Sequence, residues 1–237
     1  MPTVAEMIFN NINHVKEKQF VHSTFWYEKQ NGSQHIANRL AEGLDIRYGK
    51  SICEIRRDNG KWHVGGECFD KVVFCGNIKD VPSVLKGIDI SGYVRQIEEL
   101  EYHGTTSVFC EIDRNPYSWI YLPAHGYDSH RIICTGNFAE SNNVEGKMTA
   151  TVEFTDGKSF DDIHENLSRI PLHPRYLAHH HHEYTYPIQD IHTREMIHNL
   201  KRTLELLDFY FTGRFADWEY YNMDVAMGAA MDVCKRI

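Results

Sequence analysis

The chain is 237 residues long, with 42% hydrophobic and 12% aromatic residues and a formal net charge of −8 at pH 7. Such a chain is long enough to bury a substantial core, and its composition is that of a globular protein. The acidic balance argues against a nonspecific nucleic-acid binder, whose phosphate contacts need a basic surface. No apolar run approaches the ~20 residues of a membrane-spanning helix, so no membrane span is expected.

The N-terminal segment, residues 1–24, predicts a short amphipathic helix because Met7, Ile8, Ile12 and Val15 have helical spacing. It lacks a basic stretch followed by an apolar one, so we expect no secretory signal. The six cysteines, at positions 53, 68, 75, 110, 134 and 234, form no Cys-x-x-Cys pair. We therefore expect buried free thiols in a cytoplasmic protein.

A second helix is predicted after Gly32, with Ser33 as its N-cap and Gly43 at its end. Its apolar face comprises Ile36, Ala37, Leu40, Ala41 and Leu44. Two short strands, 51–56 and 61–64, then flank the hairpin turn Asp58-Asn59-Gly60. The apolar run 72–75, which ends at Gly76, is typical of a strand buried on both faces.

The next region is rich in strand signals. Strands are predicted at 106–112, 118–121, 131–135 and 148–153, separated by Asn-Pro, His-Gly and Asn-Asn turns. Few helical signals interrupt them before a helix at 160–168, so a mostly antiparallel sheet is expected. Four consecutive histidines, 179–182, have no adjoining Cys or Asp cluster. We therefore expect a solvated internal loop there and no metal site.

A tyrosine before a proline precedes the last long helix. Pro187 forces Tyr186 into extended geometry, from which its ring either faces a pocket or packs at a domain junction. The helix is predicted at 191–208, and a short strand follows at 210–212. The apolar face of this helix comprises Ile197, Leu200, Leu204 and Leu207.

The last twenty-five residues carry the densest set of signals. A strand end is followed by Gly213 and Arg214, an aromatic cluster, and a final helix capped by Asn222. This order aims backbone N–H groups and one guanidinium at a common point, as an anionic or electron-rich ligand requires. The alternative is an ordinary salt bridge of Arg214 with Asp217 or Glu219. The inward face of the helix is predicted to be Met223, Ala226, Met227, Ala230, Met231 and Cys234.

Familiar catalytic motifs are missing from the sequence. Without Gly-x-Ser-x-Gly there is no signal for a hydrolase elbow, and without Gly-x-x-x-x-Gly-Lys-Ser/Thr a P-loop enzyme is not expected. Cys110 and His103 can be imagined as a dyad, but a strand thiol with no fixed partner is more often part of the core. No catalytic residue is assigned.

The pattern Gly-Arg-x5-Tyr-x-Asn-Met-Asp at 213–224, followed by a small-residue helix, resembles the flavin-containing amine oxidoreductase superfamily. Its UDP-galactopyranose mutase-like branch, which includes polysaccharide-biosynthesis proteins, is the most similar. Supporting matches are Gly-Ser-Gln at 32–34, Val-Val-Phe-Cys-Gly at 72–76 and Tyr-Pro-Ile at 186–188. The resemblance spans nearly the whole chain and corresponds to the C-terminal two-thirds of the family.

The resemblance implies an α+β (α/β-derived) fold. Residues 1–77 and 191–237 would form a partial FAD-binding domain, and residues 78–190 a substrate domain with a mostly antiparallel β-sheet and flanking helices. The implied cofactor is FAD, and Tyr186 and Tyr220 are the implied substrate-binding residues, with Tyr220 reaching a diphosphate. The implied FAD-binding residues are Gly32, Ser33, Gly213, Arg214, Asn222, Met223 and Asp224.

Two departures from the family pattern matter. Asn222 stands where the mutases usually carry Asp, and no Gly-x-Gly-x-x-Gly turn for the cofactor diphosphate is present. Losing even ~4 kcal/mol of binding free energy from the diphosphate contacts weakens FAD binding about a thousandfold. We therefore expect the isolated chain to hold FAD poorly or not at all and to be inactive by itself.

Three functions stay open at this stage. The first is a truncated FAD-dependent oxidoreductase or mutase (an isomerase) of sugar-nucleotide or polysaccharide metabolism. The second is a non-catalytic nucleotide-sugar-binding module or subunit, completed by a separate N-terminal half or by self-association through exposed surface. The third is a non-functional truncated product.

Overall fold

The computed structural model describes residues 25–123, 126–144 and 146–237, and the helix predicted within residues 1–24 lies outside them. The helices of the described part are α2 (Gln34–Ala41), α3 (Val81–Val84), α4 (Ser91–Glu98), α5 (Phe160–Arg169), α6 (Ile191–Glu205) and α7 (Met223–Cys234). Its 3-10 turns are η1 (Ile78–Asp80), η2 (Thr135–Asn137) and η3 (Glu140–Asn142). Its strands are β1 (Ile55–Asp58), β2 (Lys61–Val64), β3 (Glu67–Phe69), β4 (Val72–Phe74), β5 (Leu85–Lys86), β6 (Tyr102–Ile112), β7 (Trp119–Tyr121), β8 (Ser129–Ile133), β9 (Met148–Thr155), β10 (Arg175–Pro187) and β11 (Phe209–Phe211).

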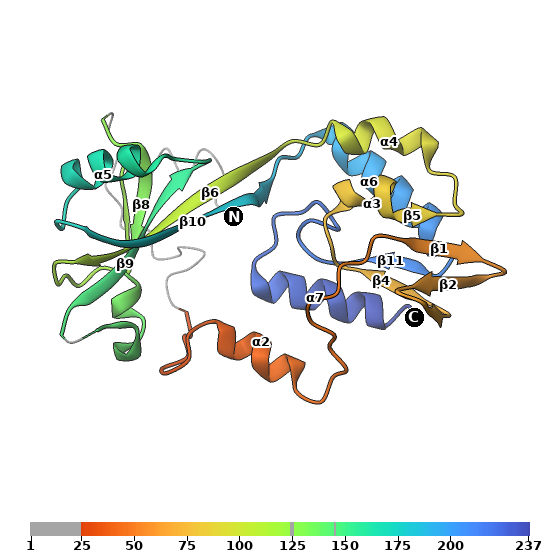
Figure 1. Ribbon diagram of the computed structural model, residues 1–237, viewed down its shortest axis with the longest axis horizontal. Coiled ribbons are helices and arrows are strands. Elements are labelled where there is room, and N and C mark those ends of the chain that lie inside the picture. The colour runs from red at the N-terminus through yellow and green to blue at the C-terminus, as the bar shows by residue number, and fades with distance from the viewer. Residues whose placement is uncertain (1–24, 124–125, 145) are drawn as a thin grey trace, which may run out of the picture.

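The predicted α+β fold with a mostly antiparallel sheet is confirmed. A five-stranded antiparallel sheet has the order β10-β6-β9-β8-β7, a four-stranded sheet has the order β3-β2-β1-β5, and β11 pairs with β4 in parallel. Figure 1 shows the large sheet with α5 at one end of the molecule. The two smaller sheets lie at the other end with α3, α4, α6 and α7, and β6 and β10 run between the two ends (Figure 1).

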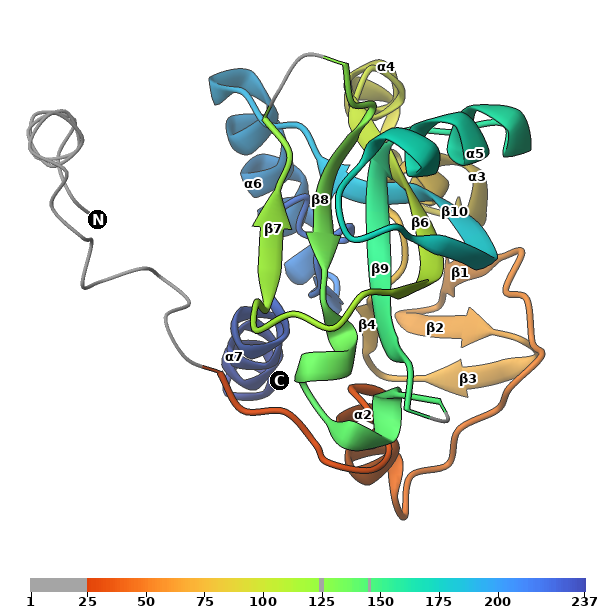
Figure 2. The same cartoon turned by 90° about the vertical axis from the view of Figure 1, so that its left-hand side faces the viewer.

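The large sheet has one covered and one open face. In Figure 2, α5 lies over the sheet near β6 and β9, and its Ile163 and Leu167 share a core with Val108, Val152 and Ile132. A capping box between Ser159 and Asp162 fixes the start of α5. Strand residues alternate between faces. The register therefore places a continuous row on the opposite face, namely His180, Ser107, Glu153, Arg131 and Tyr121.

The loop predicted for the histidine run is wrong. Residues 179–182 lie within the 13-residue edge strand β10, paired with β6 from Arg175↔Glu111 to Pro187↔Tyr102. The predicted solvent exposure is correct, because all four histidines are exposed. Backbone hydrogen bonds to β6 make this segment a strand. The sequence of the histidine run does not indicate this pairing, because β6 is distant along the chain.

A second core holds the smaller sheets and α6 together. Trp62 and Phe209 are fully buried there with ring centroids 5.0 Å apart, and Leu200 and Leu204 of α6 pack in the same cluster. The cluster takes in Ile97 and Leu100, so it continues past residue 77, where the sequence suggested a division. The division of the chain into domains stays a prediction.

The β1–β2 hairpin forms at the predicted turn. Asn59 and Gly60 both have positive φ, 48° and 80°, as a two-residue type I′ turn requires. The first strand begins at Ile55 and not at residue 51. All six cysteines are free, as expected, and the expected burial holds for Cys110 and Cys134 but not for the other four, which are exposed.

Three segments that the sequence pattern placed in the core are more exposed than predicted. Val73 of β4 is 40% exposed, α2 buries none of its residues, and the predicted inward face of α7 includes Met231, which is 64% exposed. On α7 only Val233 is buried. Within the described residues, β4 pairs with β11 alone, so its other edge and the neighbouring apolar faces lack a covering layer.

The two predicted side-chain caps are also wrong. Ser33 and Asn222 stand at the N-cap positions of α2 and α7, but neither side chain makes a capping hydrogen bond. Gly43, with φ of 78°, follows the end of α2 at Ala41.

Within the described residues, no helix combines the length and the apolar character that crossing a membrane requires.

Replacing Trp62 by Ala is expected to lower the free energy of unfolding by about 3–5 kcal/mol. The change leaves a cavity beside Phe209 and removes the hydrogen bond from Trp62 Nε1 to the Leu207 carbonyl, which is 2.9 Å long. Urea denaturation followed by circular dichroism measures the loss. Trp26→Ala is the control, because Trp26 is fully exposed and its removal should change stability by less than about 0.5 kcal/mol. Equal losses in both variants would contradict this account of the core.

Candidate functional site

The segment from Gly213 to Tyr221 is a loop fixed by a buried carboxylate. Asp217 accepts a hydrogen bond from the Gly213 N–H at 3.1 Å and pairs with Lys201 of α6. The Asp217 N–H in turn donates to the Gly213 carbonyl at 2.8 Å. Gly213 has a φ of 112°, a conformation that a residue with a Cβ rarely adopts.

Trp218 anchors the other half of this loop. Its ring is fully buried, and its Nε1 donates to the Ile188 carbonyl at 3.0 Å, in the segment that follows β10. Its φ of 51° lies in the left-handed region, which is unusual for a bulky residue and persists only where the surroundings enforce it. The loop is therefore tied both to α6 and to the end of β10.

These bonds define what Gly213 contributes to this segment. The Gly213 N–H does not point at a ligand, because the Asp217 carboxylate already accepts its hydrogen bond. What Gly213 contributes is the backbone turn that sets the direction of the next residue, Arg214. The predicted convergence of N–H groups with the guanidinium therefore does not include the N–H of Gly213.

Arg214 is held entirely by backbone carbonyls. Its Nε donates to the Tyr221 carbonyl at 2.8 Å, one terminal nitrogen donates to the same oxygen, and the other donates to the Thr185 carbonyl at 3.0 Å. The alternative salt bridge is wrong, since Asp217 pairs with Lys201 and Glu219 lies 4.0 Å from Arg194. In the described part of the chain, no carboxylate forms an ion pair with Arg214.

Two tyrosine rings lie against this guanidinium. Tyr186 and Tyr220 are stacked with centroids 5.4 Å apart and an interplanar angle of 14°. The Arg214 guanidinium carbon lies 5.6 Å from the Tyr186 centroid and 5.2 Å from the Tyr220 centroid. Tyr220 is 59% exposed, while Tyr186 is half-buried and its burial raises the pKa of its hydroxyl. Three of the residues that the sequence predicted, from two distant segments, are thus brought together.

The same group continues onto the open face of the large sheet through residues that the sequence analysis missed. Arg131 of β8 donates to the Tyr186 hydroxyl at 3.3 Å and forms an ion pair with Glu153 of β9. His130 Nε2 lies 3.6 Å from the same carboxylate. The signal that could have revealed them is strand alternation, which places Arg131 opposite Glu153 once the register of β8 and β9 is known.

Glu153 is ionised in this setting. Burial raises the pKa of its carboxyl, but the hydrogen bonds from His130 and Arg131 and the charge of Arg131 outweigh burial and hold the pKa below its usual range. The pair is therefore formally neutral. The net positive charge of the group comes from Arg214.

The other predicted site residues lie apart from this group or are only adjacent to it. Asn222, Met223 and Asp224 form the start of α7 directly after Tyr221, with Asp224 in the first helical turn. Gly32 and Ser33 lie at the start of α2, where Gly32 adjoins the Tyr27 hydroxyl. In the described residues no recorded contact joins Gly32 or Ser33 to Arg214.

The other candidate sites of the sequence are not formed. Cys110 donates to the Val108 carbonyl, and burial raises the pKa of its thiol to about 12, so it is no nucleophile at neutral pH. His103 instead faces Asp156 at 3.7 Å. In the described ranges no group of three or more His, Cys, Asp or Glu side chains could hold a metal ion.

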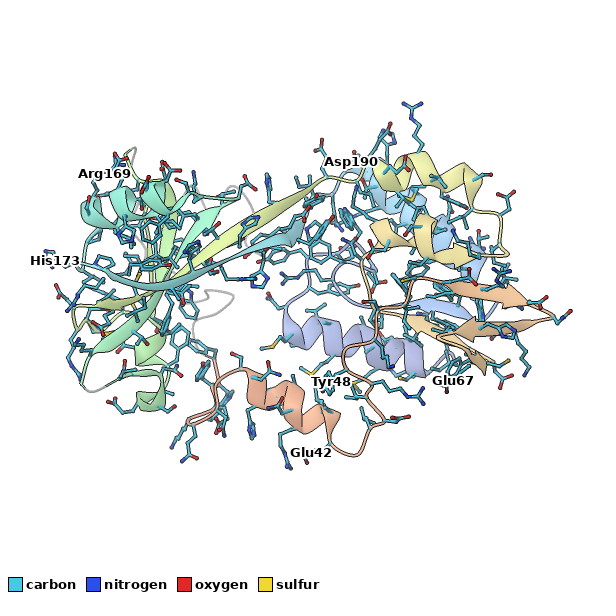
Figure 3. The ribbon with its side chains drawn as sticks, viewed as in Figure 1. Glu42, Tyr48, Glu67, Arg169, His173 and Asp190 are labelled. Carbon is cyan, nitrogen blue, oxygen red and sulfur yellow. The ribbon has the colours of Figure 1, made fainter. Side chains whose placement is uncertain are left out.

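A polar pocket of about 400 Å³ lies at the ends of α4 and α6, lined by Glu99, Glu101, Asp190 and His192 among others. Asp190 is labelled in Figure 3 where β10 gives way to α6, and it caps that helix by accepting the Thr193 N–H. The pocket shares no residue with the group around Arg214. It is therefore not part of the candidate site.

Comparison with known proteins places the fold in one class. No protein-family model and no curated protein matches the chain. Its fold, however, is that of the flavin amine-oxidase-like proteins, which confirms the resemblance inferred from the C-terminal motif.

A solved structure of reduced UDP-galactopyranose mutase matches with a TM-score of 0.72 and 17% identity, over 92% of this chain and 53% of that one. A CLA-producing fatty acid isomerase from P. acnes matches with a TM-score of 0.63 and 12% identity, over 87% and 52% of the two chains. A putrescine oxidase double mutant matches with a TM-score of 0.60 and 11% identity, over 86% and 52%. The chain thus spans about half the length of each of these proteins.

Replacing Glu153 by Gln is expected to lower the free energy of unfolding at pH 7 by about 1–3 kcal/mol, because Arg131 loses its charged partner. The folded pKa of Glu153 lies below the unfolded value of about 4.3, so its contribution is complete above that pH and disappears as pH falls through the folded pKa. Urea denaturation at pH 7, 5 and 3 should show the gap between wild type and variant closing below about pH 4. A difference in unfolding free energy that stays constant from pH 7 to pH 3 would contradict the lowered pKa of Glu153. Glu165→Gln, which changes an exposed carboxylate on α5, is the control.

Proposed function

We propose that this chain is the substrate-binding and flavin-closing part of an FAD-dependent oxidoreductase or mutase that acts on a nucleotide sugar. The observation that carries the proposal is the guanidinium of Arg214, which forms no ion pair among the described residues and is fixed beside the stacked rings of Tyr186 and Tyr220. The similarity in fold to UDP-galactopyranose mutase supports this choice of substrate class, and with it a role in sugar-nucleotide or polysaccharide metabolism. Six free thiols suit a cytoplasmic setting.

The chemistry of the group suits a diphosphate. A guanidinium has five N–H donors, and Arg214 uses three of them on the Tyr221 and Thr185 carbonyls. One N–H on each terminal nitrogen is left for an anion, and the charge of the phosphate would offset the charge of Arg214. The exposed ring of Tyr220 offers an aromatic surface and a hydroxyl to the rest of the nucleotide sugar.

The residues present fit one end of FAD and not the other. The first turn of α7 has N–H groups that the Asn222 side chain does not cap, beside Met223 and Asp224, and these suit the electron-rich edge of a flavin ring. Bound FAD would supply the redox or nucleophilic chemistry. The role of Arg214 is to hold the substrate's charge, and that of Tyr186 and Tyr220 is to orient it. The cofactor's diphosphate has no glycine-rich cradle in these 237 residues, so we expect weak FAD binding by this chain alone.

Arg214→Ala should weaken binding of UDP-galactose, measured by calorimetry, by about 10–100-fold, the equivalent of about 1.4–2.8 kcal/mol. The reason is the loss of a guanidinium that forms no ion pair with any of the described residues. Arg194→Ala is the matched control, because Arg194 is exposed and close to Glu219. The affinity of this variant for UDP-galactose should stay within about twofold of the wild-type value. The same loss in both variants, or no change in either, would exclude Arg214 from the site. Absorbance of the desalted chain after incubation with FAD tests the weak-binding expectation independently.

A second candidate function, a binding module or subunit that needs a partner, is favoured by one specific observation. Among the described residues, several apolar side chains of α2, β4, α7 and the segment after α2 are exposed, namely Ile36, Leu40, Leu44, Val73, Met223, Val225, Met227 and Met231. Tyr48, labelled in Figure 3, lies between α2 and β1 and is also exposed. Parallel strands rarely occur without covered faces, so this surface suits either a polypeptide that adds to the β4–β11 pair or a second copy of the chain.

The double change Met227→Glu and Met231→Glu should abolish concentration-dependent self-association in sedimentation experiments, because it places two charges on the exposed face of α7. Asp232→Lys, on the same helix, is a charge-changing control and should leave association intact. Monomeric wild-type protein at all concentrations would leave a partner polypeptide as the occupant. Association that survives the double change would show that α7 is not the interface.

A further inference from the structure

Strand geometry divides the histidine run into two pairs. Because side chains alternate along β10, His179 and His181 lie on one face of the sheet, and His180 and His182 lie on the other. The register sets His180 opposite Ser107 and His182 opposite Thr105, both on the open face. The four residues are therefore not equivalent, although they are identical in sequence.

The pair on the covered face is engaged by neighbouring hydroxyl groups. His179 Nδ1 lies 2.8 Å from the Tyr176 hydroxyl, and His181 Nδ1 lies 3.1 Å from the Thr106 hydroxyl. The His179 ring also packs against the Tyr176 ring, with centroids 5.8 Å apart. Each of these imidazoles has a ring nitrogen already committed within the fold.

The pair on the open face is engaged only with itself. The rings of His180 and His182 meet edge to face with centroids 4.3 Å apart. Among the described residues, no hydrogen bond or ion pair involves either side chain, and both are exposed at the edge of the sheet. Rotation about the side-chain bonds can therefore bring one nitrogen of each ring to a common point while the paired strand stays fixed.

We propose that His180 and His182 form a two-imidazole chelating site for a divalent transition-metal ion, with water completing the coordination. Imidazole nitrogen is a preferred ligand of Cu²⁺, Ni²⁺ and Zn²⁺, and among these Cu²⁺ binds such ligands most strongly. A rigid strand holds the two ligands together before the ion arrives, so the second metal–nitrogen bond costs little ordering entropy. The site needs no third protein ligand, in keeping with the absence of any larger metal-binding group in the described residues. It revises the expectation from sequence that the run holds no metal.

The test uses the untagged 237-residue protein and Cu²⁺ alone, titrated by calorimetry at pH 7.5 and followed by electron paramagnetic resonance. The double variant His180→Ala/His182→Ala should weaken the tightest Cu²⁺ site at least tenfold and remove the nitrogen hyperfine pattern of two imidazoles. His179→Ala/His181→Ala is the matched control, because it removes the same number of histidines from the other face of the sheet. This variant should keep both the Cu²⁺ affinity and the nitrogen hyperfine pattern of the wild type. Circular dichroism confirms that each variant is folded.

Single variants separate chelation from independent binding. His180→Ala and His182→Ala should each weaken the site almost as much as the double change, because chelation needs both nitrogens at once. The proposal would be overturned if the two double variants lost the same Cu²⁺ affinity. It would also be overturned if each single variant lost only half of the binding free energy that the double change removes.

Discussion

The arrangement of the candidate site depends on the carboxylate of Asp217. By accepting the Gly213 N–H and pairing with Lys201, it closes the loop that follows β11 and ties that loop to α6. The buried ring of Trp218 fastens the same loop to the chain beyond β10. In this loop, Arg214 lies against the rings of Tyr186 and Tyr220. The guanidinium donates to the Tyr221 and Thr185 carbonyls and forms no ion pair among the described residues, and the proposal that this loop receives an anion rests on that arrangement.

Side chains from the large sheet and from the segment after β11 meet around Arg214. Arg214 and Tyr220 come from the segment after β11, Tyr186 from the end of β10, and Arg131 and Glu153 from the large sheet. A ligand bound there would contact both halves of the molecule shown in Figure 1. The segment after β11 supplies a guanidinium that forms no ion pair among the described residues, and the large sheet supplies the hydrogen-bonded pair of Arg131 and Glu153.

The sequence predicted what local patterns encode. Alternation and turn residues revealed most strands of the large sheet, and the Asn59-Gly60 turn located the β1–β2 hairpin of the four-stranded sheet. The motif at 213–224 led to Arg214, Tyr220 and the fold. What failed depended on partners distant in sequence. The histidine run became a strand because β6 pairs with it, and Gly213 lost its N–H to Asp217. The faces of α2 and α7 looked like core from their composition, yet nothing in the described chain covers them. Arg131 and Glu153 were invisible without the register.

The central claim is that Arg214 recognises a phosphate group, and the most direct measurement compares UDP with uridine. These ligands share a base and a ribose and differ in the diphosphate, so the ratio of their dissociation constants isolates the contribution of charge. The account predicts that the wild-type chain prefers UDP by about tenfold or more, and that Arg214→Ala removes most of this preference while uridine binding is unchanged. A preference for UDP that survives intact in Arg214→Ala would contradict the account.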